Sequence, residues 1–312
     1  MNPAQPLISF ITICYNGLED TCELIESLRN KIHSVSYEII VVDNASRKDE
    51  AAAISSRYPF VTAIRNPVNN GFSGGNNVGI RHAQGSYLFF INNDTFIEED
   101  GIQALVERLE SSPQIGGVSP KLRFAFPPQH VQFAGFTPLS RFALRNRTLG
   151  YDCVDDGSYD TAHPTPYLHG AAMLIKRQVI EEAGLMPEIF FLYYEELDWC
   201  TSMTRAGYEL WYEPRCTIFH KESRSTGQLS KTRTYYLTRN RLLYARRNLR
   251  GMRRAVSLIY LSTVAAAKNA LSYLLQHRWD LAGEVCRATK DGWSPTLREE
   301  KLCVNSPNPP QP

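Results

Sequence analysis

Two groups of acidic residues follow apolar segments in this 312-residue chain. The first group, Asn92–Thr95 (NNDT), comes directly after the apolar run Tyr87–Ile91. A carboxylate at this position is solvated, so Asp94 can simply form a turn or cap the next helix. It can equally bind a hard cation, because Mg²⁺ or Mn²⁺ needs only one or two protein carboxylates when a diphosphate supplies further oxygens.

The second group lies in Phe190–Trp199 (FFLYYEELDW), where Glu195, Glu196 and Asp198 follow five apolar or aromatic residues. Acids are favourable in the first turn of a helix, which accounts for one or two of the three. An acid against apolar surface and near like charges has a raised pKa, which suits a general base. The segment therefore indicates a helix start, a catalytic base, or both.

Two further segments carry groups that could contact a ligand. His220 follows the apolar segment Thr217–Phe219, although a single histidine is more often structural than a metal ligand. Residues 69–79 (NNGFSGGNNVG) form a Gly/Asn-rich loop that opens a helix, where backbone N–H groups could face phosphate. This loop matches neither the P-loop nor the G-x-G-x-x-G fingerprint, so alone it is weak evidence.

Strand and helix patterns alternate over the first 125 residues, with apolar residues at helical spacing between the short β-branched runs. Asp20 and Glu23 are the predicted N-cap and capping-box residues of the first helix. The predicted strands are Leu7–Cys14, Glu38–Val42, Val61–Ile64 and Tyr87–Ile91. This alternation predicts a mostly parallel sheet covered by helices on both faces.

Ligands of such sheets bind outside the carboxyl ends of the strands. This rule places Tyr15, Asp43, Asn44 and Asp94 along one edge. Residues 125–170 are rich in proline and aromatic residues and predict an irregular insertion with one or two strands. Further along, the expected strands are Ala171–Ile175, Leu210–Tyr212 and Thr217–Phe219, and the expected helices are Gln178–Ala183 and Glu195–Ala206.

The composition is that of a soluble globular protein, with 43% hydrophobic residues, 21% charged residues and a net charge of +2. The N-terminus lacks the basic region of a signal peptide. Seven cysteines, without a C-x-x-C pair, favour reduced thiols in a cytosolic protein. No stretch of about 18 uncharged apolar residues supports a membrane-spanning helix.

The last part of the chain is basic. Lys231–Arg254 contains nine Lys or Arg and no acid, and Ala255–Leu275 follows as a semi-apolar helix interrupted by Lys268 and Asn269. A solvated helix face explains the charge without a partner, and nucleic-acid binding lacks a supporting motif. Contact of residues 231–275 with an anionic membrane leaflet is favoured. The last ten residues are polar and Pro-rich, which predicts disorder.

Eight segments, in order, resemble the inverting family 2 glycosyltransferases with the GT-A fold, within them the rhamnosyltransferase-like branch. The resemblance covers Leu7–Arg247 through ITICYNG, YEIIVVDNAS, NNGFSGGNNVGI, GSYLFFINNDT, YLHGAAMLIKR, EAGLMPEIFFLYYEELDWCTSMTRAGY, FHKESRSTG and YYLTRNRLLY. It implies an α/β fold with a mostly parallel central sheet flanked by helices, plus a C-terminal helical extension. The catalytic domain would be 1–228, with a donor half at about 1–125 and an acceptor half at about 126–228, and the extension 229–312.

The resemblance also implies roles for single residues. On the donor side, Tyr15 would stack near the base, Asp43 and Asn44 would contact base or ribose, and Asn76 and Asn93 would contact the nucleotide sugar. Asp94 would bind the metal, and His220 the metal or diphosphate. Glu196 would be the general base beside Glu195. Many relatives have Asp at the positions of Asn44 and Glu196. The nucleobase that the donor carries therefore stays open, as does the choice between Glu196 and Asp198 as the general base.

The implied reaction is a single displacement that inverts the anomeric carbon, with Mg²⁺ or Mn²⁺ and a dTDP- or UDP-linked sugar, foremost dTDP-rhamnose. The acceptor would be a glycan or a lipid-linked glycan of a surface polysaccharide. The expected location is the cytoplasm, peripheral to the cytoplasmic membrane face, with no nucleic-acid partner and an oligomeric state that the sequence leaves open. The alternatives are the same fold with UDP-galactose or UDP-N-acetylglucosamine, or a sugar-nucleotide-binding protein that has lost catalysis.

Overall fold

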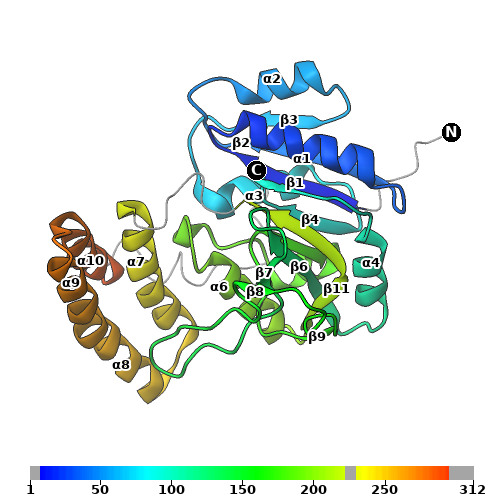
Figure 1. The fold of residues 1–312 in the computed structure, drawn as a ribbon. Coiled ribbons are helices and arrows are strands. Elements are labelled where there is room, and N and C mark those ends of the chain that lie inside the picture. Colours follow the sequence, from blue (N-terminus) through cyan, green and yellow to red (C-terminus); the bar gives the residue numbers. More distant parts are fainter. Residues whose placement is uncertain (1–7, 222–229, 295–312) are drawn as a thin grey trace.

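The computed structural model describes residues 8–221 and 230–294, and a single 11-stranded sheet organises the first of these parts (Figure 1). The strands are β1 (Ile8–Cys14), β2 (Tyr37–Asp43), β3 (Thr62–Arg65), β4 (Tyr87–Ile91), β5 (Thr95–Phe96), β6 (Ile115–Phe124), β7 (His130–Phe133), β8 (Cys153–Val154), β9 (His163–Pro164), β10 (Ala172–Lys176) and β11 (Glu209–His220). The main path runs β3-β2-β1-β4-β10-β6-β11-β5.

Most long strands of this path are parallel. β1 pairs in parallel with β2 and β4, β2 with β3, and β6 with β11. β10 lies between β4 and β6 and is antiparallel to both. As a result, β1, β2, β4 and β11 all end at the same edge of the sheet.

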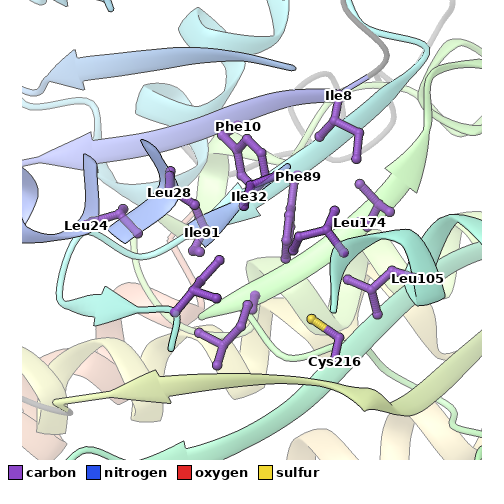
Figure 2. Packing of buried hydrophobic residues seen from close by; sticks show 14 of the residues in the cluster. Ile8, Phe10, Leu24, Leu28, Ile32, Phe89, Ile91, Leu105, Leu174 and Cys216 are labelled. Carbon is purple, nitrogen blue, oxygen red and sulfur yellow. The ribbon is translucent and has the colours of Figure 1, made fainter. Parts of the chain in front are cut away.

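Helices cover both faces. They are α1 (Leu18–Lys31), α2 (Glu50–Arg57), α3 (Gly71–His82), α4 (Ile102–Glu110), α5 (Arg177–Ala183), the short 3₁₀ turn η1 (Glu188–Phe190) and α6 (Glu195–Arg205). Alternate residues of each strand point to opposite faces. On β1, Phe10 packs in the core under α1, α2 and α4, and Ile11 packs in the core under α3, α5 and α6. Figure 2 shows the first of these cores, with Phe10 and Phe89 of the sheet near Leu24 and Leu28 of α1.

The predicted α/β architecture with C-terminal helices is confirmed, and several details differ. β6 was not expected, because Gly116, Gly117 and Pro120 mask its apolar pattern, yet it is buried almost throughout. The two strands expected at 210–219 form one strand, β11, with an irregularity in its pairing between Glu213 and Thr217. The insertion at 125–170 contributes only the short strands β7, β8 and β9.

The predicted capping box of α1 is wrong. The helix begins at Leu18, with Gly17 at the N-cap position, so Asp20 already lies in its first turn. Asp20 and Glu23 instead accept hydrogen bonds from the ammonium group of Lys221, each at 2.6 Å. The acids therefore connect α1 to the residue that follows β11.

The C-terminal extension is helical, as predicted, and is a small bundle beside the α/β unit (Figure 1). Its elements are α7 (Lys231–Asn248), α8 (Gly251–Tyr260), the π-helical turn η2 (Leu261–Ala265), α9 (Ala266–Leu275) and α10 (Trp279–Gly292). α10 packs against both α7 and α9, while α7 also contacts α6 and η1. The expected disorder at the last ten residues and the domain boundary near 228 lie outside the described residues, so both stay predictions.

The sequence alone did not support a membrane-spanning helix, yet one helix of the structure is long and apolar enough to be a candidate. α8, η2 and α9 form a continuous helix, Gly251–Leu275, with a mean hydropathy of 1.3 over its most apolar window. Its length and composition would allow it to cross a membrane, although Arg253, Arg254 and Lys268 interrupt its apolar sequence. Only 17% of that window is buried inside the protein.

Candidate active site

The residues at the carboxyl ends of β4 and β11 meet at one point of the sheet edge. Thr95 of β5 pairs directly with His220 at the end of β11, which brings Asp94 to the imidazole. Asp94 Oδ1 lies 3.1 Å from His220 Nε2, and both side chains are mostly buried. The other ring nitrogen, His220 Nδ1, lies 2.8 Å from Oε1 of the buried Gln132 on β7. When Nδ1 donates to Gln132, Nε2 presents a lone pair toward Asp94.

The charge state of Asp94 follows from these contacts. Burial alone would raise the pKa of Asp94, but the hydrogen bond and charge of His220, together with the charge of Lys221, hold it below its usual value. Asp94 is therefore ionised at neutral pH. The carboxylate oxygen of Asp94 and Nε2 of His220 face each other at 3.1 Å, and such a pair can hold a proton or a cation between them.

These donors suit a divalent cation only when a ligand completes the coordination. No group of three or more His, Cys, Asp or Glu that could hold a metal occurs in residues 8–221 and 230–294. One carboxylate and one imidazole are nevertheless sufficient protein ligands when a diphosphate supplies the remaining oxygens. Gln132 fixes the imidazole, as the outer partners of metal-binding histidines commonly do.

The paired glutamates begin α6. Glu195 is almost completely buried, Glu196 is half-buried, and Oε2 of each has no hydrogen-bond partner. Burial raises the pKa of Glu196 to about 6, although backbone N–H groups at the helix start oppose the shift. Burial and the charge of Glu196 raise the pKa of Glu195 well above its usual value. The pair thus retains a proton on Glu195, while Glu196 ionises near pH 6 and can accept a proton.

The segment before β10 connects the glutamates to the Asp94–His220 pair. The ring of His169 lies 6.5 Å from that of His220, centroid to centroid. A Cβ at the neighbouring Gly170 would lie 3.9 Å from Cγ of Glu196 and 4.0 Å from the ring of Phe72. His220, Glu196 and the first turn of α3 therefore surround the same short segment.

The start of α3 offers unsatisfied polar groups. Ser73 Oγ and Asn76 Nδ2 are both buried and lack hydrogen-bond partners, so either can serve a ligand at this end of the helix. Tyr15, which follows β1, is 47% exposed and free to stack on a planar group. The roles predicted for Tyr15 and Asn76 stay predictions.

Three other predicted ligand contacts already have partners within the protein. Asp43 accepts hydrogen bonds from the backbone N–H groups of Ser46, Glu50 and Ala51. Asn44 is hydrogen-bonded to residues of the 66–71 loop, and Asn93 donates to Gly17 and Thr21. These side chains shape the loops around the candidate ligand site, and contact with base, ribose or sugar stays a prediction for each.

Asp198 has internal partners as well. Its carboxylate is fully buried and accepts hydrogen bonds from Arg247 Nε at 2.8 Å and Asn248 Nδ2 at 2.5 Å. Burial raises the pKa of Asp198, while Arg247 and Asn248 oppose the shift. Because these contacts connect α6 to α7, the geometry favours Glu196 over Asp198 as the proton acceptor.

The loop before Glu195 has an unusual backbone. Phe191, Tyr193 and Tyr194 all have positive φ angles, a region that non-glycine residues rarely occupy. Asn240 of α7, itself fully buried, donates through Nδ2 to the carbonyls of Phe190, Leu192 and Tyr193 at 2.7–2.9 Å.

Two further contacts hold the same loop. Arg239 Nη2 donates to the carbonyls of Ile189 and Phe190. From the other side, the N–H of Phe72 donates to the carbonyl of Phe191 at 2.7 Å. We call Arg239 and Asn240 the α7 clamp. It fixes the strained loop that aims the two glutamates.

Sequence reasoning missed Gln132, His169 and the α7 clamp as parts of this site. The segment that contains Arg239 and Asn240 was recognised as one of the eight family-like segments and as part of a basic run, but neither residue was given a role in the site. Its signal was an Asn between two Arg in a stretch of aromatic residues, and the partners are backbone carbonyls about 50 positions earlier. Backbone acceptors leave no mark in a sequence.

The sequence pattern of the family described as "Glycosyl transferase family 2" matches residues 9–183. The chain is 27% identical over 243 residues to the Haloferax volcanii hexosyltransferase Agl10 of low-salt glycan biosynthesis, covering 76% of this chain and 74% of that protein. It is 23% identical to a Mycobacterium tuberculosis N-acetylglucosaminyl-diphospho-decaprenol L-rhamnosyltransferase, covering 61% and 68%. For two further relatives the match covers only 36% and 25% of their length.

The fold is also found among solved structures. A mannosyltransferase from Pyrobaculum calidifontis, solved in complex with GDP-Man and Mn²⁺, superposes with a TM-score of 0.57 at 16% identity. The match covers 93% of this chain and 88% of that one. This likeness, together with the sheet order, confirms the predicted GT-A fold.

Asn240→Ala tests the clamp. Without the amide, the carbonyls of residues 190–193 lose donors and the positive-φ residues can relax, so we expect faster amide hydrogen exchange in 191–196. Exchange of β1 and β4 should stay unchanged. The control Gln276→Ala removes an exposed amide of the same helical extension and should alter neither region. Equal protection of 191–196 in Asn240→Ala and the parent would contradict the clamp.

Proposed function

This chain belongs to glycosyl transferase family 2, and we propose that it transfers a sugar from a nucleoside diphosphate to an acceptor hydroxyl by a metal-dependent displacement with inversion. The observation that carries this proposal is the arrangement around Gly170. A carboxylate with a pKa of about 6 lies near Gly170, and an Asp–His pair suited to a cation lies near the adjacent His169.

In the proposed reaction, Glu196 accepts the proton of the acceptor hydroxyl. The acceptor oxygen forms a bond to the anomeric carbon as the bond from that carbon to the diphosphate oxygen breaks. The electron pair of the broken bond leaves with the nucleoside diphosphate. Attack from the side opposite the leaving group inverts the anomeric carbon. Glu195 keeps its proton and the α7 clamp keeps Glu196 in position.

Asp94 and His220 are the residues that would hold Mg²⁺ or Mn²⁺, with Gln132 orienting the imidazole. A bound cation would neutralise the charge that develops on the departing diphosphate. The solved mannosyltransferase contains Mn²⁺ and a nucleotide sugar, which supports the same combination here. Tyr15, Ser73 and Asn76 are the residues we propose for contact with the donor.

We further propose a lipid-linked glycan as acceptor and dTDP-rhamnose as the foremost donor. The support is the relative that bears the name of an N-acetylglucosaminyl-diphospho-decaprenol L-rhamnosyltransferase. UDP-galactose and UDP-N-acetylglucosamine remain the alternative donors. The same support favours a cytoplasmic enzyme of polysaccharide synthesis that works at the membrane face.

We narrow the proposed membrane contact from residues 231–275 to the outer face of α8–α9. Several cations of α7 have partners within the protein instead, because Arg239, Arg246 and Arg247 donate to carbonyls or to Asp198. Ile259, Val264 and Leu271, by contrast, are more than half exposed on α8–α9.

Val264 lies within the π-helical turn η2, five residues after Ile259, and a π-helical turn is wider than an α-helical one. Exposed Arg250, Arg253, Arg254 and Lys268 accompany this face, and Gly251–Leu275 contains no acid. An apolar face with accompanying cations matches an anionic lipid surface. Because Leu258 and Leu261 of the same helix pack inside the extension, we propose that the helix lies on the membrane.

Glu196→Gln should lower kcat by about 10²–10⁴-fold, because the amide cannot accept the acceptor proton. Since Glu196 must be ionised, kcat/KM of the parent should fall about tenfold per pH unit below pH 6. Steady-state rates with a donor panel check both expectations. Glu182→Gln, an exposed acid on α5, is the control. Unchanged turnover in Glu196→Gln would exclude this base, and no turnover in the parent with any donor would favour a binding protein that has lost catalysis.

Asp94→Ala should abolish a metal-dependent interaction with nucleotides. We expect nucleoside diphosphates with Mn²⁺ to raise the thermal midpoint of the parent, because a ligand that binds only the folded state stabilises it. The shift should vanish in Asp94→Ala and persist in Asp152→Ala, which removes an exposed aspartate that also pairs with a histidine, His130. A shift of equal size without Mn²⁺, or in Asp94→Ala, would contradict a metal at this site.

Replacing Ile259 and Leu271 together by Asp should abolish flotation of the full chain with vesicles that contain phosphatidylglycerol, because charges on this face oppose lipid contact. Val154→Asp is the control, since Val154 is similarly exposed but belongs to β8 and not to the α8–α9 helix. Flotation of the double variant with the parent's efficiency would exclude this face as the contact.

A further inference from the structure

A buried arginine of α7 has no acidic partner. Arg241 retains only 8% of its surface, and its Nε has no hydrogen-bond partner. Within the described parts of the chain, no carboxylate forms an ion pair with it, in contrast to Arg247 one turn and a half further on, which pairs with Asp198. Burying a guanidinium without a counter-charge is costly, so this position calls for an explanation.

A second arginine lies beside the first. Arg145 directly follows Leu144, whose carbonyl accepts a hydrogen bond from the Tyr194 hydroxyl at 2.8 Å, and Tyr194 packs on Tyr244, three residues after Arg241 on α7. In keeping with this placement, the charge of Arg241 and partial burial lower the pKa of Arg145. Arg145 is an exposed residue of the loop between β7 and β8, and it too lacks an ion pair among the described residues. The phenol groups of Tyr194, Tyr260 and Tyr273 are the other titratable groups near this pair.

Arg241 borders a small open pocket between α7 and the α8–α9 helix. The pocket is lined by Thr238 and Arg241 from α7, and by Leu261, Ala265, Ala266 and Asn269 from the helix across it. Two of these residues, Thr238 and Asn269, can donate hydrogen bonds as well. The pocket is thus formed by the same helix whose opposite face is the proposed membrane contact.

The position of Tyr194 relates the arginine pair to the active site. Tyr194 is buried, lies near both guanidinium groups and is followed directly by Glu195 and Glu196. The arginine pair therefore lies near the residue that directly precedes the two glutamates, and Arg241 also borders the helix that carries the proposed membrane contact. An acceptor that reaches from this helix to the base would have the pair close to its path.

A phosphate group matches these observations. The planar guanidinium binds phosphate oxygens through two parallel hydrogen bonds, and an anion between two cations removes their mutual repulsion. We propose that Arg145 and Arg241 bind a phosphate or diphosphate group of the acceptor. Binding of a phosphate group by the two arginines does not depend on the proposed function. Only the assignment of this phosphate to the acceptor rests on it.

The probe is inorganic pyrophosphate, titrated calorimetrically into the full chain with a chelator so that no divalent cation is present. Arg145→Gln and Arg241→Gln should each weaken its affinity about tenfold or more, because each removes charge-assisted hydrogen bonds. Arg147→Gln, an exposed arginine of the same loop, should bind as the parent does. Asp94→Ala should also bind as the parent does, which separates this site from the donor site.

The proposal is overturned if pyrophosphate fails to bind the parent, or binds both arginine variants with the parent's affinity. Loss of Mn²⁺-dependent nucleotide binding in Arg145→Gln would likewise overturn it, by assigning the pair to the donor. Should Arg241→Gln fold poorly, the exposed Arg145→Gln decides. If the phosphate belongs to the acceptor, Arg145→Gln should float with phosphatidylglycerol vesicles as the parent does. If flotation and pyrophosphate affinity are both reduced in this variant, the phosphate belongs to a lipid headgroup. Failure of nucleotide binding in the parent would refute the proposed function and leave the pyrophosphate result untouched.

Discussion

The contact on which this site depends is the set of hydrogen bonds from one buried amide, Asn240, to three backbone carbonyls. The loop that it holds contains three non-glycine residues with positive φ, each of which costs free energy in isolation. Such a backbone conformation is stable only when several surrounding contacts hold it in place. Phe72 supplies another of these contacts, because its N–H donates to Phe191 from the donor side. The base, the donor loop and the C-terminal extension therefore share one loop.

This arrangement explains why a helical extension with many arginines is attached to an α/β unit. Burial of a glutamate raises its pKa, and the sheet alone does not cover the start of α6. α7 covers it, because Tyr244 packs on Tyr194 and Arg247 pairs with Asp198. The carboxylates of one helix thus differ in role because of their partners. Asp198 has a guanidinium, whereas Glu195 and Glu196 each keep an oxygen with no partner.

The sequence was sufficient to predict the fold, most of the long elements and the residues that meet at the sheet edge. Periodicity locates β1, β2 and β4, and parallel pairing then brings their carboxyl ends together. It could not locate β6, whose glycines and proline hide a buried strand, nor the start of α1, where Gly17 caps the helix in place of an acid. Propensities describe local preference, and in both cases tertiary packing decided the outcome.

The site shows the same limit at the level of single side chains. Residue type indicated Asp94, His220 and Glu196, because carboxylates and imidazoles are few and their chemistry is specific. It could not tell that Asp43 accepts hydrogen bonds from backbone N–H groups, which carry no side-chain signature, or that Asn44 is hydrogen-bonded to the 66–71 loop. The basic run of α7 is a related case, because the charge pattern did not indicate which of its cations have partners within the protein. A cation is expected in solvent, and only the folded structure reveals which arginines meet carbonyls or a carboxylate, and that Arg241 meets neither.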